Sequence, residues 1–139
     1  MSRPSLPRAL SSIVAGAITF FVLAVGLFGF LLQDALAPTV ASYAGLYPDM
    51  PRFILLFLGD ALWAALLFVL LCFQSPNSLW AAARTGAFVM ALVGASNVVH
   101  DLATTNLLIG SPLLLLDVLG MSLIGAAVAV VMCKIGLVE

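Results

Sequence analysis

Four long apolar runs, separated by short polar connections, account for most of this chain. Each run is long enough for a helix that crosses a bilayer, which needs roughly 20 residues. The short connections place successive helices side by side in opposite directions. The pattern predicts an all-α, antiparallel four-helix bundle that forms a single transmembrane domain over residues 1–139. The expected helices cover about residues 10–37, 52–73, 79–105 and 112–134.

Turn-forming residues mark the ends of these runs. Pro38 cannot continue the first helix, and Pro112 suits the first turn of the last one. Between the second and third runs, the sequence QSPNS at 74–78 predicts a tight turn. This turn makes the second and third helices expected neighbours.

Composition supports a membrane protein. Hydrophobic residues make up 64% of the chain and charged residues 8%, which leaves too little polar surface for a soluble domain. A net charge of -1 without a Lys/Arg run argues against a nucleic-acid partner. The expected surroundings are the lipid bilayer. The apolar run that begins near Leu10 also exceeds the hydrophobic part of a secretion signal, so we expect it to be retained as a helix.

The basic residues predict the orientation. An even number of spans places both termini on one side, together with Arg3, Arg8, Arg84 and Lys134, whereas Arg52 lies on the other side. The positive-inside rule then predicts a multi-pass membrane protein with both termini in the cytoplasm.

In this orientation the acidic residues gather on the outer side. Only Glu139 falls inside, and the other five acids are Asp34, Asp49, Asp60, Asp101 and Asp117. Asp60 and Asp117 lie roughly two turns inside their helices, where a carboxylate that faced lipid would be costly. Some of these groups are therefore expected to be protonated, paired with His100 or Arg52, or bound to a cation.

The expected ligand-binding residues combine these acids with nearby polar groups. Asp60 and Asp117 would be the deep carboxylates, His100 and Asp101 the mouth of the pocket, and Asn97 and Thr104 neutral hydrogen-bonding groups. The predicted function is binding or transport of a small cationic or polar solute, or of a lipid headgroup. The alternative is a structural or accessory membrane subunit whose polar cluster locks the helices.

Enzymatic chemistry has weaker support. An enzyme for a lipid-like substrate, with His100 and a carboxylate as acid and base, is the third hypothesis. Metal-binding residue types are present, but a single histidine without a ligand-type spacing leaves the metal open, and no cofactor is predicted. Cys72 and Cys133 lie far apart without a CxxC motif, which favours an apolar packing role.

The C-terminal half carries a recognisable pattern: His100-Asp101-Leu102-x-Thr104-x-Asn106, Pro112, and Asp117-x-x-Gly120. Over roughly residues 84–130 it resembles a family of small four-helix bacterial membrane proteins of unknown function. In that family a tyrosine stands at the position of His100 and a tryptophan at that of Leu119, and the threonine–asparagine spacing differs. The resemblance implies the helix count and a shared polar site, and it implies no activity.

Small residues at helical spacing predict close contacts between helices. The expected sets are Gly26 with Gly29, the row Ala87, Ala91 and Ala95, and Gly125 with Ala129. Such faces also permit a homo-oligomer or association with another membrane subunit.

Overall fold

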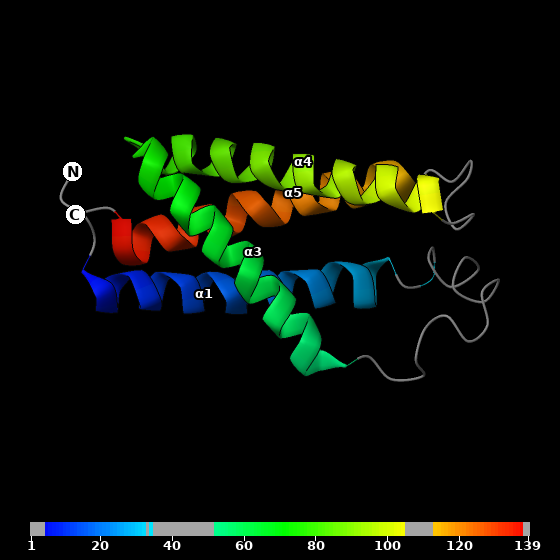
Figure 1. Ribbon diagram of the computed structural model, residues 1–139, viewed down its shortest axis with the longest axis horizontal. Coiled ribbons are helices and arrows are strands. Elements are labelled where there is room, and N and C mark those ends of the chain that lie inside the picture. The colour runs from blue at the N-terminus through cyan, green and yellow to red at the C-terminus, as the bar shows by residue number, and fades with distance from the viewer. Residues whose placement is uncertain (1–4, 33, 35–51, 105–112, 138–139) are drawn as a thin grey trace.

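All regular secondary structure in the described part of the chain is helical. The computed structural model describes residues 5–32, 34, 52–104 and 113–137. Helix α1 continues directly into the π-helix η1, and α5 continues into the π-helix η2 (Figure 1). The elements are α1 (Leu6–Ala24), η1 (Val25–Leu31), α3 (Phe53–Gln74), α4 (Leu79–Thr104), α5 (Leu113–Met132) and η2 (Cys133–Leu137).

Four of these helical segments are long and apolar enough to cross a membrane, which confirms the predicted all-helical class and the number of candidate spans. They are Leu6–Leu31, Phe53–Gln74, Leu79–His100 and Leu115–Gly136. The first helix begins earlier than the apolar run alone predicts. Pro7 lies in its first turn, where the missing N–H of a proline is not needed.

The predicted turn separates α3 from α4. Helix α3 ends at Gln74, and Ser75 takes a left-handed conformation with φ 46°. The Ser78 hydroxyl oxygen then accepts a hydrogen bond of 3.1 Å from the Ala81 N–H. A serine at this place caps the free donors of the first turn of α4.

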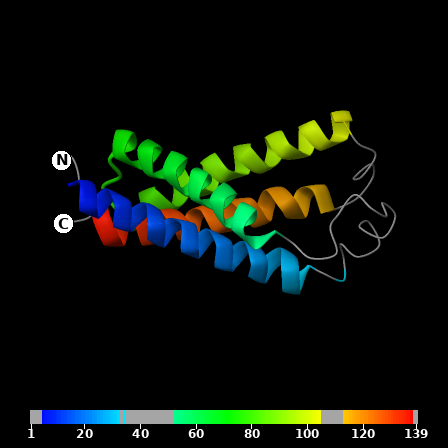
Figure 2. The ribbon, with the colours of Figure 1, turned by 60° about the horizontal axis from the view of Figure 1, so that its bottom comes forward.

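Helix α5 lies at the centre of the molecule, packed most extensively on α4 and also on α1. Helix α3 crosses α1 obliquely and has few contacts with α4 or α5 (Figures 1 and 2). The turn at 74–78 therefore holds the ends of α3 and α4 together without packing the two helices along their length. The start of α1 and the end of η2 lie at the same end of the molecule.

Glycines allow α4 and α5 to approach closely. A Cβ atom on Gly86 would lie 2.6 Å from the Cβ of Ala129 and 2.8 Å from the carbonyl carbon of Gly125. Gly125 and Ala129 thus provide the contact that their spacing predicts. On α4, however, the residues that are buried are one position away from the predicted alanine row. They are Ala82, Gly86, Met90 and Gly94, whereas Ala87, Ala91 and Ala95 are half-buried.

The predicted close approach at Gly26 and Gly29 is not seen. No described atom lies within 4 Å of a Cβ built on Gly26, and a Cβ on Gly29 would contact only Val25, at 3.7 Å. These glycines therefore do not serve as a helix-packing surface among the described residues.

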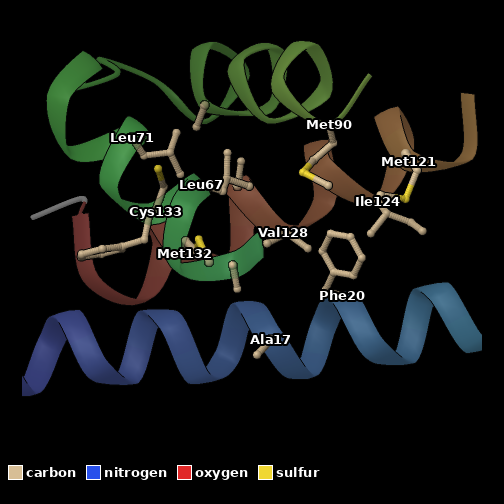
Figure 3. Packing of buried hydrophobic residues seen from close by; sticks show 14 residues of the cluster. Ala17, Phe20, Leu67, Leu71, Met90, Met121, Ile124, Val128, Met132 and Cys133 are labelled. Carbon is tan, nitrogen blue, oxygen red and sulfur yellow. The ribbon is translucent and has the colours of Figure 1, made fainter. Parts of the chain in front are cut away.

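The apolar core lies between α5 and its neighbours. Phe20 from α1, Leu67 from α3 and Met90 from α4 converge on Val128 and Met132 of α5 (Figure 3). Near the chain ends, the buried Ser12 hydroxyl donates a 3.5 Å hydrogen bond to the Met132 carbonyl. This bond gives a buried polar group in α1 its partner at the end of α5.

Candidate functional site

A pocket of about 490 Å³ lies where α3 crosses the far end of α1. Nearly all of its wall is apolar and rich in phenylalanine. Asp60 is the charged residue among those that line it. The lining residues are Phe21, Ala24, Val25, Phe28, Gly29, Phe30, Phe53, Leu56 and Asp60.

Aromatic contacts hold the two walls together. The ring of Phe21 on α1 forms T-shaped pairs with the rings of Phe53 and Phe57 on α3. The ring centroids are 6.4 Å apart in the first pair and 5.9 Å in the second, and the interplanar angles are 79° and 77°. Such T-shaped pairs are a favoured arrangement of aromatic rings. They fix the first two turns of α3, and hence Asp60, against α1.

The other wall includes the π-helix η1. Its wider turn is visible where the Leu32 N–H donates to the Leu27 carbonyl, five residues back, at 2.9 Å. Short π segments occur frequently at functional sites, where the extra residue per turn redirects side chains. Here four residues of η1 line the pocket: Val25, Phe28, Gly29 and Phe30.

Asp60 is half-buried in this pocket and has no hydrogen bond or ion pair with a described residue. An unpaired carboxylate in an apolar setting is unfavourable. Phenylalanine faces carry negative electrostatic potential and attract cations. The pocket thus combines one acid with several rings, and both features favour a positively charged occupant.

The remaining predicted residues belong to α4 and α5. Asn97 and His100 lie one turn apart on α4 and are exposed, and Asp117 on α5 is half-buried. His100 and Asp117 each have an interaction partner. The side chains of Asp101 and Thr104 lie outside the described residues.

One contact links α5 to the pocket that Asp60 lines, called the Asp60 pocket below. A Cβ on Gly120 would lie 2.7 Å from Leu27 Cδ2 and 3.0 Å from Phe28 Cζ, so Phe28 lies between α5 and the pocket. Asp117 precedes Gly120 by about one turn. Asp60 and Asp117 thus belong to helices on either side of η1, and a single pocket that joins all six residues stays a prediction.

The sequence pattern does not indicate the phenylalanines or η1 as parts of the site. A phenylalanine within an apolar run has no distinguishing signal, because most such residues face lipid or core. Gly29 also lines the pocket, and a Cβ built there would contact only Val25, at 3.7 Å, so the missing side chain leaves space on this wall.

Among the described residues, no three His, Cys, Asp or Glu side chains lie close enough together to hold a metal ion. Comparisons with family models, with curated proteins and with solved structures each gave no match.

Proposed function

We propose that the chain is a multi-pass protein of the bacterial inner membrane that binds or transports a small organic cation in the outer half of an antiparallel four-helix bundle. Asp60 supplies the charge that recognises the cation, and the phenylalanines of α1, η1 and α3 surround its apolar part. The observation that carries this proposal is the unpaired Asp60 inside a phenylalanine-lined pocket.

The exposed surface supports placement in a bilayer. Large apolar side chains remain accessible on every candidate span, including Phe30, Ile54, Leu62, Phe88 and Leu123. An apolar surface of this extent suits lipid rather than water. Asp60 stands seven residues after Phe53, which is roughly 10 Å along the helix. This depth lies within the hydrocarbon region, where ionisable groups commonly mark a binding site or pathway.

The same geometry disfavours other solutes. An anion would be repelled by Asp60, and an uncharged apolar molecule would leave the carboxylate unpaired in a still drier pocket. A cation gains both an ion pair and contact with ring faces. Asn97, His100, Asp101, Thr104 and Asp117 would then form a polar neighbourhood on α4 and α5 at the outer end.

The structural-subunit alternative retains one supporting observation. His100 and Asp117 already have interaction partners, as polar residues that fix helix packing would. This observation concerns α4 and α5 and leaves the Asp60 pocket unexplained.

A binding experiment with tetraphenylphosphonium tests the proposal. Purified protein in a non-ionic detergent is titrated calorimetrically, with uncharged triphenylphosphine oxide as the matched neutral compound. We expect the cation alone to bind, and Asp60→Asn to weaken binding at least about tenfold, which corresponds to roughly 1.4 kcal/mol. Asp34→Asn removes the same charge from an exposed position outside the pocket and should have no effect.

A second pair of variants tests the pocket itself. Gly29→Leu places a side chain in the pocket without removing a charge. Gly26→Leu adds the same side chain at a residue that does not line the pocket and whose Cβ would have no described atom within 4 Å. Only Gly29→Leu should abolish binding. Equal binding of the neutral compound, or an Asp60→Asn variant with unchanged affinity, would contradict the proposal.

A further inference from the structure

A second concavity opens on the opposite half of the molecule, where α3 and α4 leave their shared turn. It has a volume of about 1050 Å³. Its apolar lining comes from Leu70 and Phe73 of α3 and from Phe88 and Ala91 of α4, and Ser122 of α5 also lines it. The groove exists because α3 crosses towards α1 and has few contacts with α4.

The end of this groove near the turn is polar and cationic. Arg84 lines it, is exposed, and has no hydrogen bond or ion pair with a described residue. Beside it, the Thr85 hydroxyl, which has a single proton to donate, lies within hydrogen-bonding distance of both the Gln74 side-chain oxygen and, at 3.0 Å, the Ala81 carbonyl. No acidic residue is among the described residues that line the groove.

The groove is therefore cationic at one end and apolar farther along, which matches the charged headgroup and the apolar acyl chains of a phospholipid. Ala91 follows Arg84 by seven residues, which places the apolar part roughly 10 Å deeper along the helix. Trp80, one turn before Arg84, is 72% exposed, as suits an indole at the membrane–water interface. With the headgroup at Arg84, an acyl chain of the same lipid would lie along Phe88 and Ala91.

The positive charge at this end of the molecule favours an anionic headgroup. The turn between α3 and α4 lies at the same end as the start of α1 and the end of η2 (Figure 1). Exposed Arg8 and Lys134 belong to these two segments. Basic residues near a membrane surface attract anionic lipids, with about 1 kcal/mol for each. A zwitterionic headgroup would not neutralise Arg84 to the same extent.

We propose that this groove, the Arg84 groove, binds one anionic phospholipid of the cytoplasmic leaflet, with its phosphate on Arg84 and an acyl chain between α3 and α4. The proposal rests on the proposed membrane placement but not on cation binding at Asp60. Asp60→Asn should therefore leave lipid binding unchanged, which separates failure of one proposal from failure of the other.

Native mass spectrometry and thermal unfolding in detergent test the lipid site, with phosphatidylglycerol and phosphatidylcholine of identical acyl chains as probes. We expect the wild-type protein to retain phosphatidylglycerol preferentially and to unfold at a higher temperature in its presence. Arg84→Gln should reduce that retention about fivefold. Arg52→Gln removes the same charge from the start of α3, at the other end, and should retain the preference.

A second pair of variants distinguishes a groove from simple surface attraction. Ala91→Phe fills the groove while Arg84 remains, and Leu92→Phe enlarges the adjacent exposed side chain outside the groove. Only Ala91→Phe should lower phosphatidylglycerol retention. Equal retention of both lipids by the wild type, unchanged retention in Arg84→Gln, or a lipid-free dimer that covers the groove would overturn the proposal.

Discussion

At Gly86 the backbone of α4 lies so close to α5 that a methyl group has no room. A Cβ there would lie 2.6 Å from the Cβ of Ala129 and 2.8 Å from the carbonyl carbon of Gly125, both on a helix rather than at the end of a flexible side chain. We expect Gly86→Ala to lower the free energy of unfolding by about 1–3 kcal/mol, because such overpacking forces the backbones apart. Reversible unfolding in detergent, followed by circular dichroism, measures the change.

Gly59 provides the matched control, since no described atom lies within 4 Å of a Cβ built there. Gly59→Ala should leave stability unchanged or raise it by up to about 1 kcal/mol, the difference in helix propensity between the two residues. If the two substitutions had equal effects, close backbone approach would not be what stabilises the α4–α5 pair.

At the level of residues, the sequence located the charges better than the contacts. A carboxylate within an apolar run is unusual, and this marks Asp60 in the sequence. Helical spacing predicts a packing surface at Ala87, Ala91 and Ala95, but the buried row begins at Ala82 and includes Gly86 and Gly94. Both rows have helical spacing, and only the position of α5 decides between them.

At the level of elements, Phe21 connects α1 to the start of α3. Its ring forms T-shaped pairs with Phe53 and Phe57, each worth about 0.5–1.5 kcal/mol beyond burial. Phe21→Leu keeps an apolar side chain and removes both pairs, so we expect a loss of about 1–3 kcal/mol. Backbone amides in the first turns of α3 should also exchange faster with deuterated solvent.

Phe73→Leu is the control for this substitution, because Phe73 is 85% exposed and has no ring partner among the described residues. It should change neither stability nor exchange. Faster exchange throughout all helices of the Phe21→Leu protein would instead indicate that α3 does not open separately from the rest.

Helix limits could be predicted largely from hydropathy, and the turn at 74–78 from its serines and proline. The crossing direction of α3 could not, because a short turn brings two helix ends together without setting the angle between them. The π-helix η1 was also not predicted, since its apolar sequence VGLFGFL is compatible with an ordinary α-helix. The candidate pocket depends on both features, so the sequence alone indicates only its charged residue.

At the level of the whole molecule, the distribution of basic residues determines the expected orientation. Arg8, Arg84 and Lys134 belong to the end where α1 begins and η2 ends, and Arg52 directly precedes α3 at the opposite end. We expect a C-terminal green fluorescent protein fusion to fluoresce and a C-terminal alkaline phosphatase fusion to be inactive, because basic ends remain in the cytoplasm. Fusions within the connection at 38–51 should give the reverse result.

Charge substitutions test whether the basic residues are the cause. Arg84→Gln combined with Lys134→Gln reduces the difference between the two sides and should produce a mixed population, whereas Arg52→Gln increases it and should leave the orientation intact. A periplasmic C-terminus in the wild-type protein would contradict the prediction. It would also place the Asp60 pocket towards the cytoplasm and the Arg84 groove in the outer leaflet, so this measurement determines which solution each site faces.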